Sequence, residues 1–83
     1  NIVSVSLAVP HTSSALYRLL TKFSVAGLNL CMIESSPVAN TDFDVIFYLD
    51  FEGRITTPDV AKLINELNSE LSYFKFLGNY AEV

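Results

Sequence analysis

The chain has 83 residues, a net charge of −4 and an apolar fraction of 51%, which suits one small domain with part of its apolar surface covered by a partner. Its five basic residues are spread along the sequence, so the clustered basic surface that binds nucleic acid is excluded. No apolar run approaches the roughly 18 to 20 residues that cross a bilayer, and no signal-peptide pattern opens the chain, so we expect neither membrane insertion nor secretion.

The first part of the chain predicts a strand followed by a helix. Apolar residues alternate with small ones over residues 2–9, as in a half-buried strand, and Pro10 ends it. The polar residues 11–14 supply candidate helix N-caps. An amphipathic helix is then predicted over about 13–26, because apolar residues recur there at helical spacing, namely Ala15, Leu16, Leu19, Leu20 and Phe23.

A second strand is predicted directly after this helix. Gly27 can take the left-handed conformation that ends a helix. The dense apolar run over 28–33 is typical of a buried strand, which we place at about 29–36, before Pro37. Cys31 lies inside this run, and we interpret it as a small buried hydrophobe of an intracellular protein. A cytoplasmic location is therefore expected.

The remaining part of the chain predicts strand, helix and strand. Residues 43–51 form a strand with two faces, and residues 52–54 form a turn. One face of this strand carries Phe43, Val45, Phe47, Leu49 and Phe51, and the other carries Asp44, Ile46, Tyr48 and Asp50. A helix begins around Pro58, which the first helical turn tolerates well, and ends near Ser72. The last strand runs from Tyr73 to about residue 80.

The predicted order is therefore β-α-β-β-α-β, which indicates an α+β chain of the ferredoxin-like class. Right-handed crossovers place both helices on one face of a four-stranded antiparallel sheet. Residues 1–83 form a single domain on this interpretation. Because the sequence opens at Asn1, without Met and directly in an alternating pattern, we expect it to be a piece of a longer polypeptide.

Catalytic chemistry is weakly supported by the residues. The lone histidine, His11, stands beside Ser13 and Ser14, but neighbours at a helix start rarely hold triad geometry and are more simply capping residues. No spacing suits zinc or calcium, so no catalytic residue, metal or cofactor is expected. An acylphosphatase-type enzyme shares the topology but needs an early arginine, whereas the first one here, Arg18, falls in mid-helix.

Ligand binding is better supported than catalysis. A helix start accepts a carboxylate readily, and Asn29 has donor and acceptor atoms for an amino group, although it is equally well explained as a turn residue after Gly27. The second strand starts near the C-terminal end of the helix rather than near its start. A pocket shared between two subunits would therefore suit a ligand that touches both segments.

Four segments together resemble the ACT domain at the C-terminal end of prephenate dehydratases: residues 11–17, 27–30, 33–37 and 76–80. The resemblance covers essentially the whole chain. It implies a regulatory domain that binds L-phenylalanine between two ACT domains, in a homodimer or higher homo-oligomer. It also implies an upstream catalytic domain, a lyase of phenylalanine biosynthesis, that this effector inhibits. It leaves open which aromatic amino acid is preferred and whether a chorismate mutase is fused to the chain.

The two signatures of the family fall on identifiable residues. Its Gly-Ala-Leu segment corresponds to 14–16, with Ser14 in place of the glycine, and its Glu-Ser-Arg-Pro segment to 34–37, with Ser36 in place of the arginine. An ACT-type dimerisation module that has lost effector binding is the alternative. The ligand-binding residues implied by the resemblance are Thr12, Ser13, Ser14, Ala15, Leu16, Asn29, Leu30, Glu34, Ser35, Ser36 and Pro37.

Overall fold

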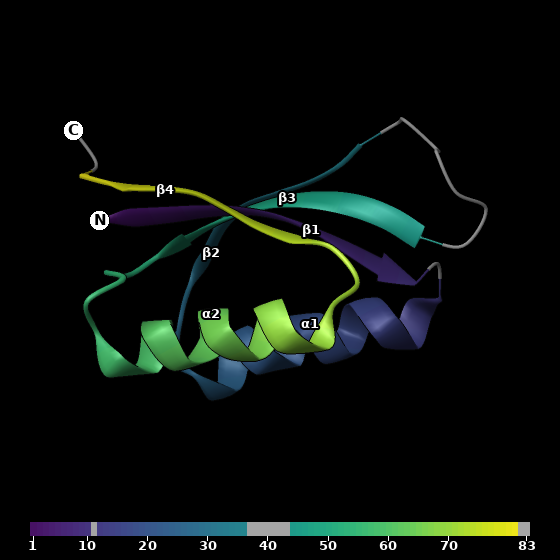
Figure 1. Cartoon of the computed structure of the whole chain (residues 1–83), viewed down its shortest axis with the longest axis horizontal. Helices are drawn as coiled ribbons and strands as arrows, with labels where there is room; N and C mark the ends of the chain where they lie inside the picture. Colours follow the sequence, from purple (N-terminus) through teal and green to yellow (C-terminus); the bar gives the residue numbers. More distant parts are fainter. Residues whose placement is uncertain (11, 37–43, 82–83) are drawn as a thin grey trace.

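The computed structural model describes residues 1–10, 12–36 and 44–81, which form one antiparallel sheet and two helices (Figure 1). The strands are ordered β2-β3-β1-β4 in the sheet, so the predicted ferredoxin-like β-α-β-β-α-β arrangement is confirmed. The predicted elements agree with the observed ones to within about two residues. The elements are β1 (Ile2–Pro10), α1 (Ser13–Val25), β2 (Leu30–Ser35), β3 (Asp44–Glu52), α2 (Pro58–Glu70) and β4 (Phe74–Tyr80).

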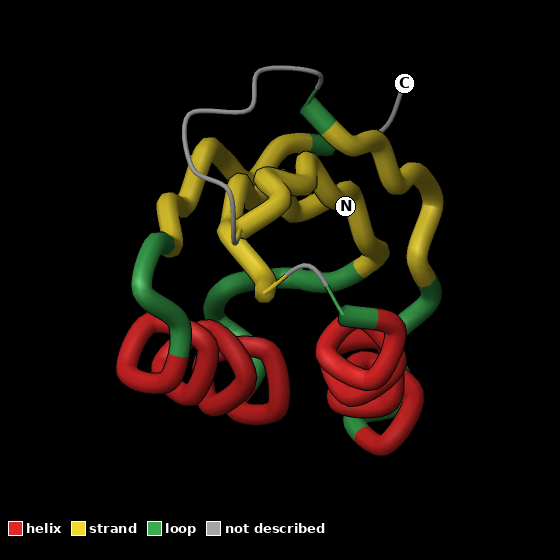
Figure 2. The backbone as a smooth tube through the Cα atoms, turned by 90° about the vertical axis from the view of Figure 1, so that its right-hand side faces the viewer, coloured by secondary structure: helices red, strands yellow, loops and turns green. Residues whose placement is uncertain are grey.

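Both helices lie on the same side of the sheet, as the end-on view shows (Figure 2). The core forms between them and the inward face of β1 and β3, because alternate residues of a strand point to one face. The rings of Phe23 from α1 and Phe51 from β3 meet edge to face, with centroids 5.0 Å apart. The buried core residues are Val3, Val5, Leu7, Val9, Leu19, Phe23, Leu49, Phe51, Val60, Leu63 and Leu67.

Residues 30–35 form a strand as predicted, but the prediction that this apolar run is buried is wrong. Strand β2 is at the edge of the sheet, with β3 as its one neighbour, and most of its residues are exposed. Cys31, expected to be a buried hydrophobe, is exposed, and Ile33 is 43% exposed. The pairing with β3 also shifts register between Leu30 and Met32. An edge strand with an irregular register cannot bury a continuous apolar run.

The two helices are terminated by different devices. Helix α1 is capped by Thr12, whose hydroxyl accepts a hydrogen bond from the Ala15 amide at 3.3 Å. Its other end closes at Gly27, with a φ of 74°, and the next amide, of Leu28, donates to the carbonyl of Phe23 at 3.0 Å. This is the left-handed glycine end that the sequence predicted. Helix α2 begins at Pro58 without a side-chain cap.

One side chain, that of Asn79 in β4, joins three segments that are distant in sequence. Its oxygen accepts from the Ile55 amide at 3.0 Å, and its nitrogen donates to the carbonyls of Ile2, at 3.0 Å, and Gly53, at 3.4 Å. These bonds hold the turn between β3 and α2 against the start of β1. The end of the sheet at which β1 begins and β4 ends is therefore fixed by side-chain hydrogen bonds as well as by strand pairing.

Candidate ligand-binding site

The first group of candidate residues surrounds the start of α1. Thr12 and Ser14 are exposed, with their hydroxyl oxygens 3.5 Å apart, while Ala15 and Leu16 are half-buried and pack against the core. The Ala15 and Leu16 amides also donate to the Thr12 carbonyl, at 3.2 and 3.5 Å. Ser13 begins the helix, whose amide dipoles favour an anion at this position.

A second group, at the end of β2, lies at the same end of the sheet. The last residue of β1, Pro10, pairs with the first residue of β3. Ser35 of β2 pairs with Phe47, and the Ser36 amide donates to the Ile46 carbonyl at 2.7 Å. Strands β1 and β2 are therefore parallel, with β3 between them, and both run toward the start of α1. Glu34 and Ser35 are exposed, and Pro37 lies outside the described residues, as does His11.

A third group lies at the opposite end of the sheet. The carbonyl of Asn29 accepts from the Glu52 amide at 2.9 Å, and its side-chain nitrogen donates to the Glu52 carboxylate at 3.1 Å. Leu30, next to it, is half-buried against the core. Helix α1 has 13 residues, so this end is about 20 Å from the helix start. An amino acid is much shorter than this distance, so in one copy of the chain it cannot contact both Asn29 and Thr12.

Glu52 is a candidate residue that the sequence analysis missed. It is exposed, and its carboxylate lies beside the Asn29 amide, where an ammonium group would find both a charge and a carbonyl oxygen. The sequence assigned Glu52 to the turn after the third strand. Only the pairing of β2 with β3 brings it next to Asn29, so no local signal could have identified it.

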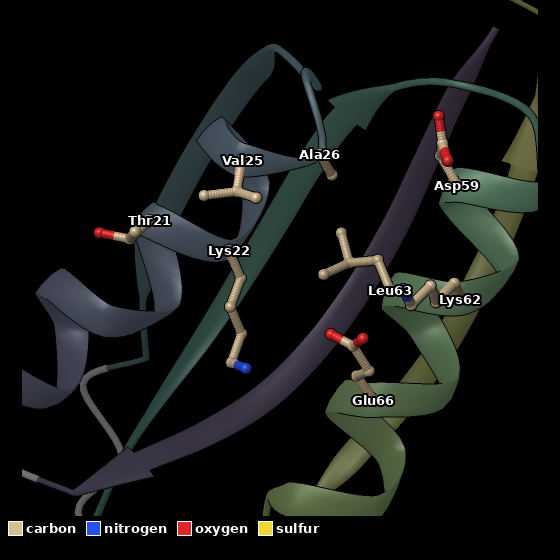
Figure 3. Close-up of a pocket in the computed structure, with 8 residues that line it drawn as sticks. All are labelled: Thr21, Lys22, Val25, Ala26, Asp59, Lys62, Leu63 and Glu66. Carbon is tan, nitrogen blue, oxygen red and sulfur yellow. The ribbon is translucent and has the colours of Figure 1, made fainter.

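A groove of about 400 Å³ lies between the C-terminal half of α1 and α2 (Figure 3). Its lining includes both cations and anions, and none of the residues implied by the sequence. Lys22 forms an ion pair with Glu70 of α2, 2.9 Å between nitrogen and oxygen. The lining residues are Thr21, Lys22, Val25, Ala26, Asp59, Lys62, Leu63 and Glu66.

Within residues 1–10, 12–36 and 44–81, no three His, Cys, Asp or Glu side chains are grouped so that they could hold a metal ion. Over the same part of the chain, neither helix has the length and apolar character needed to cross a membrane.

Comparison with known proteins finds relatives over nearly the whole chain, although no family model matches it. A bifunctional chorismate mutase/prephenate dehydratase of Aquifex aeolicus is 35% identical over 77 residues, which are 93% of this chain and 21% of that protein. A prephenate dehydratase of Amycolatopsis methanolica is 28% identical over 78 residues, 94% of this chain and 26% of that protein. The chain thus spans about a quarter of the length of these relatives.

Solved structures give the same result. The structure of prephenate dehydratase in complex with L-Phe from Arthrobacter aurescens matches with a TM-score of 0.87 and 30% identity, over 98% of this chain and 27% of that one. The match to curated relatives falls in their C-terminal part.

Proposed function

The chain is related over nearly its whole length to the ACT domain at the C-terminal end of prephenate dehydratases, and from this relationship we propose that it is a regulatory domain that binds L-phenylalanine. The observation that carries the proposal is the match to a prephenate dehydratase in complex with L-Phe, at a TM-score of 0.87 over 98% of the chain. In this proposal the effector binds at the contact between two copies of the domain.

The separation of the candidate residues supports a site shared between two copies. One copy supplies the start of α1, where the helix amides and dipole favour the carboxylate of the ligand. The other copy supplies Asn29 and Glu52, whose oxygens suit its ammonium group. The aromatic ring packs on half-buried leucines, Leu16 of the first copy and Leu30 of the second. Residues 34–36, at the same end of the sheet as the helix start, close the site there.

Regulation follows if the ligand favours one arrangement of the two copies. A ligand shifts an equilibrium only by its difference in affinity for the two states. The chain spans about a quarter of its curated relatives, so we propose that these 83 residues are one regulatory domain of a longer chain whose catalytic part is a prephenate dehydratase, a lyase, in the cytoplasm. The bound effector would reduce the activity of that upstream part.

The alternative is an ACT-type module that joins two chains without binding an effector. It is favoured by one observation: the exposed Ser14 side chain stands in the first turn of α1, 3.5 Å from the Thr12 hydroxyl, where the related family has glycine. A side chain at this position limits how closely a ligand approaches the helix amides. Ser36, where the family has arginine, removes a cation that could pair with a carboxylate.

The test is the thermal midpoint of the chain with and without L-phenylalanine, with L-tyrosine and D-phenylalanine as controls. A ligand at 100 times its dissociation constant stabilises by about 2.7 kcal/mol, which raises the midpoint of a domain this size by roughly 10 to 20 °C. Asn29→Ala should abolish the rise. Asn68→Ala, at an exposed position of α2, is the matched control and should keep it.

The two functions predict different results for this measurement. A stereospecific rise with the unchanged chain supports the effector-binding domain. If the folded chain shows no rise, and Ser14→Gly with Ser36→Arg restores one, the dimerisation module is the correct function. If neither protein responds to any aromatic amino acid, both the site and the effector are wrong.

A further inference from the structure

The outer face of the sheet is the face opposite the two helices. Within the described residues both helices lie on the other side (Figure 2). Three tyrosines lie on this face, Tyr48, Tyr73 and Tyr80, and each is 41% to 51% exposed, with the Tyr80 hydroxyl 3.2 Å from that of Ser4. Between them, strand β1 carries small side chains that their neighbours cover: Ser6 is 2% exposed and Ala8 is 5% exposed. The outer face therefore carries large exposed side chains on either side of small covered ones.

One row across the outer face carries opposite charges at its two ends. The strand pairings place Glu34 of β2 opposite Tyr48 of β3, Tyr48 opposite Ser6 of β1, and Ser6 opposite Lys75 of β4. Directly opposite residues of antiparallel strands point to the same face. The row Glu34-Tyr48-Ser6-Lys75 thus lies at one height on the sheet, and both charged side chains are exposed.

The neighbouring row toward the Pro10 end has the same alternation of size. Ile46 of β3 pairs with Ala8 of β1. The Ser36 amide bonds to the Ile46 carbonyl, and the Ala8 amide bonds to the Tyr73 carbonyl at 3.0 Å. From β2 to β4, the side chains of this row are in turn small, large, small and large, namely Ser36, Ile46, Ala8 and Tyr73.

The next row toward the Ile2 end of β1 begins with a large side chain in β2 and ends with a glycine in β4. Met32 pairs with Asp50, Asp50 with Ser4, and Ser4 with Gly78.

A two-fold axis running along the strands makes these rows complementary to themselves. Such an axis leaves the height of every residue unchanged and exchanges the two halves of the sheet, so β2 of one copy lies over β4 of the other, and β3 over β1. Lys75 then faces Glu34 of the second copy, and Tyr48 faces the small residue Ser6. Packed β-sheets are held about 10 Å apart by such interdigitating side chains.

We propose that the outer sheet face binds a second copy of this chain, sheet against sheet, about a two-fold axis along the strands, with Lys75 of each copy opposite Glu34 of the other. This interface does not depend on the proposed ligand binding, since it lies on the face away from α1 and its capping residue Thr12, although it uses Glu34 and Ser36, two of the candidate ligand-binding residues. An axis across the strands would instead place each strand over its own copy, so that Lys75 of β4 would not face Glu34 of β2.

The first test is a charge swap read by sedimentation in a dilution series, at low salt and without phenylalanine. Lys75→Glu and Glu34→Lys each turn two attractive contacts of the dimer into repulsive ones, so each raises the dissociation constant about tenfold, or about 1.4 kcal/mol. The double variant should return it to near the original value. Lys62→Glu, an exposed residue of α2, makes the same charge change away from this face and should have no such effect.

A further variant tests the centre of the interface. The Asp50 carboxylates of the two copies approach the axis from either side. Each accepts a hydrogen bond from Ser4 of its own chain at 2.6 Å, and their mutual repulsion opposes association. Asp50→Asn should therefore tighten the dimer severalfold.

The proposal is overturned if the chain stays monomeric at millimolar concentration, if the single charge reversals have no more effect than Lys62→Glu, or if the double variant does not restore the dissociation constant.

Cross-linking gives a second, independent readout. In a Cys31→Ser background, the sites of Glu34→Cys and Lys75→Cys in one chain are separated by three strand spacings, about 14 Å. A thiol reagent with a reach of about 10 Å should join position 34 of one copy to position 75 of the other. The double-cysteine chain should give covalent dimer, and each single-cysteine chain should not. Equal cross-linking in the single-cysteine chains would contradict the two-fold arrangement.

Discussion

Gly53, in the turn between β3 and α2, allows the sharpest prediction of stability. Its φ is +159°, and its amide donates to the Asn1 carbonyl at 2.9 Å. A Cβ atom at this position would lie 2.9 Å from Cγ2 of Val60, a core residue that is 1% exposed. Gly53→Ala should therefore push Val60 out of its packed position or displace the turn.

The expected magnitude combines two costs. Overpacking a filled core costs about 1 to 3 kcal/mol, and a backbone conformation that side chains rarely adopt costs about 1 to 3 kcal/mol. The sum, roughly 2 to 6 kcal/mol, is a large part of the stability of a domain this size, about 4 to 12 kcal/mol. The thermal midpoint should fall by at least about 10 °C.

The other two glycines of the chain provide matched controls in the same assay. A Cβ at Gly27 meets no atom within 4 Å, but its φ of +74° remains unfavourable, so Gly27→Ala should cost about 1 to 2 kcal/mol. A Cβ at Gly78 also meets no atom within 4 Å, and Gly78→Ala should change stability by less than about 1 kcal/mol. Urea unfolding measures all three. If Gly53→Ala is as stable as Gly78→Ala, the clash with Val60 is not real.

Further predictions concern caps, the core and the side-chain bonds, all measured by urea unfolding. Thr12→Ala should cost about 1 kcal/mol because its hydroxyl caps α1, whereas Thr57→Ala, which removes no cap bond, should cost almost nothing; equal effects would contradict this. Leu67→Ala, at a fully buried position, should cost about 2 to 5 kcal/mol. Asn79→Ala should cost about 1 to 3 kcal/mol, more than Lys22→Met, whose ion pair is partly exposed and contributes at most about 1 kcal/mol.

Strands with strict alternation were predictable from sequence, and the edge strand was not. Alternation along β1 and β3 identified which residues face the helices, because period two is a local property. The burial of β2 depends on strand order, which places it beside β3 alone. A dense apolar run such as 28–33 is compatible with a central strand or with an edge strand. Cys31 is exposed because β2 lies at the edge of the sheet.

The candidate site divides in the same way. The helix start at 12–16 could be identified from capping residues that act within a few positions. The approach of Glu52 to Asn29 depends on register between β2 and β3, and the bonds of Asn79 cross 24 to 77 residues. Contacts at such separations leave no local pattern, so the sequence could not predict them.

The strand order has a consequence for the route by which the chain folds. Strand β2 pairs with the next strand in sequence, but the central strand β1 pairs with β3 and β4, so that Ser4 bonds residues 46 and 76 positions away. Closing loops of this length must precede those contacts, which slows folding. We expect the β2–β3 pair to be able to form early and the β1–β4 pair last. The hydrophobic core and the pairing of strand β1 would then be completed together, in one late cooperative step.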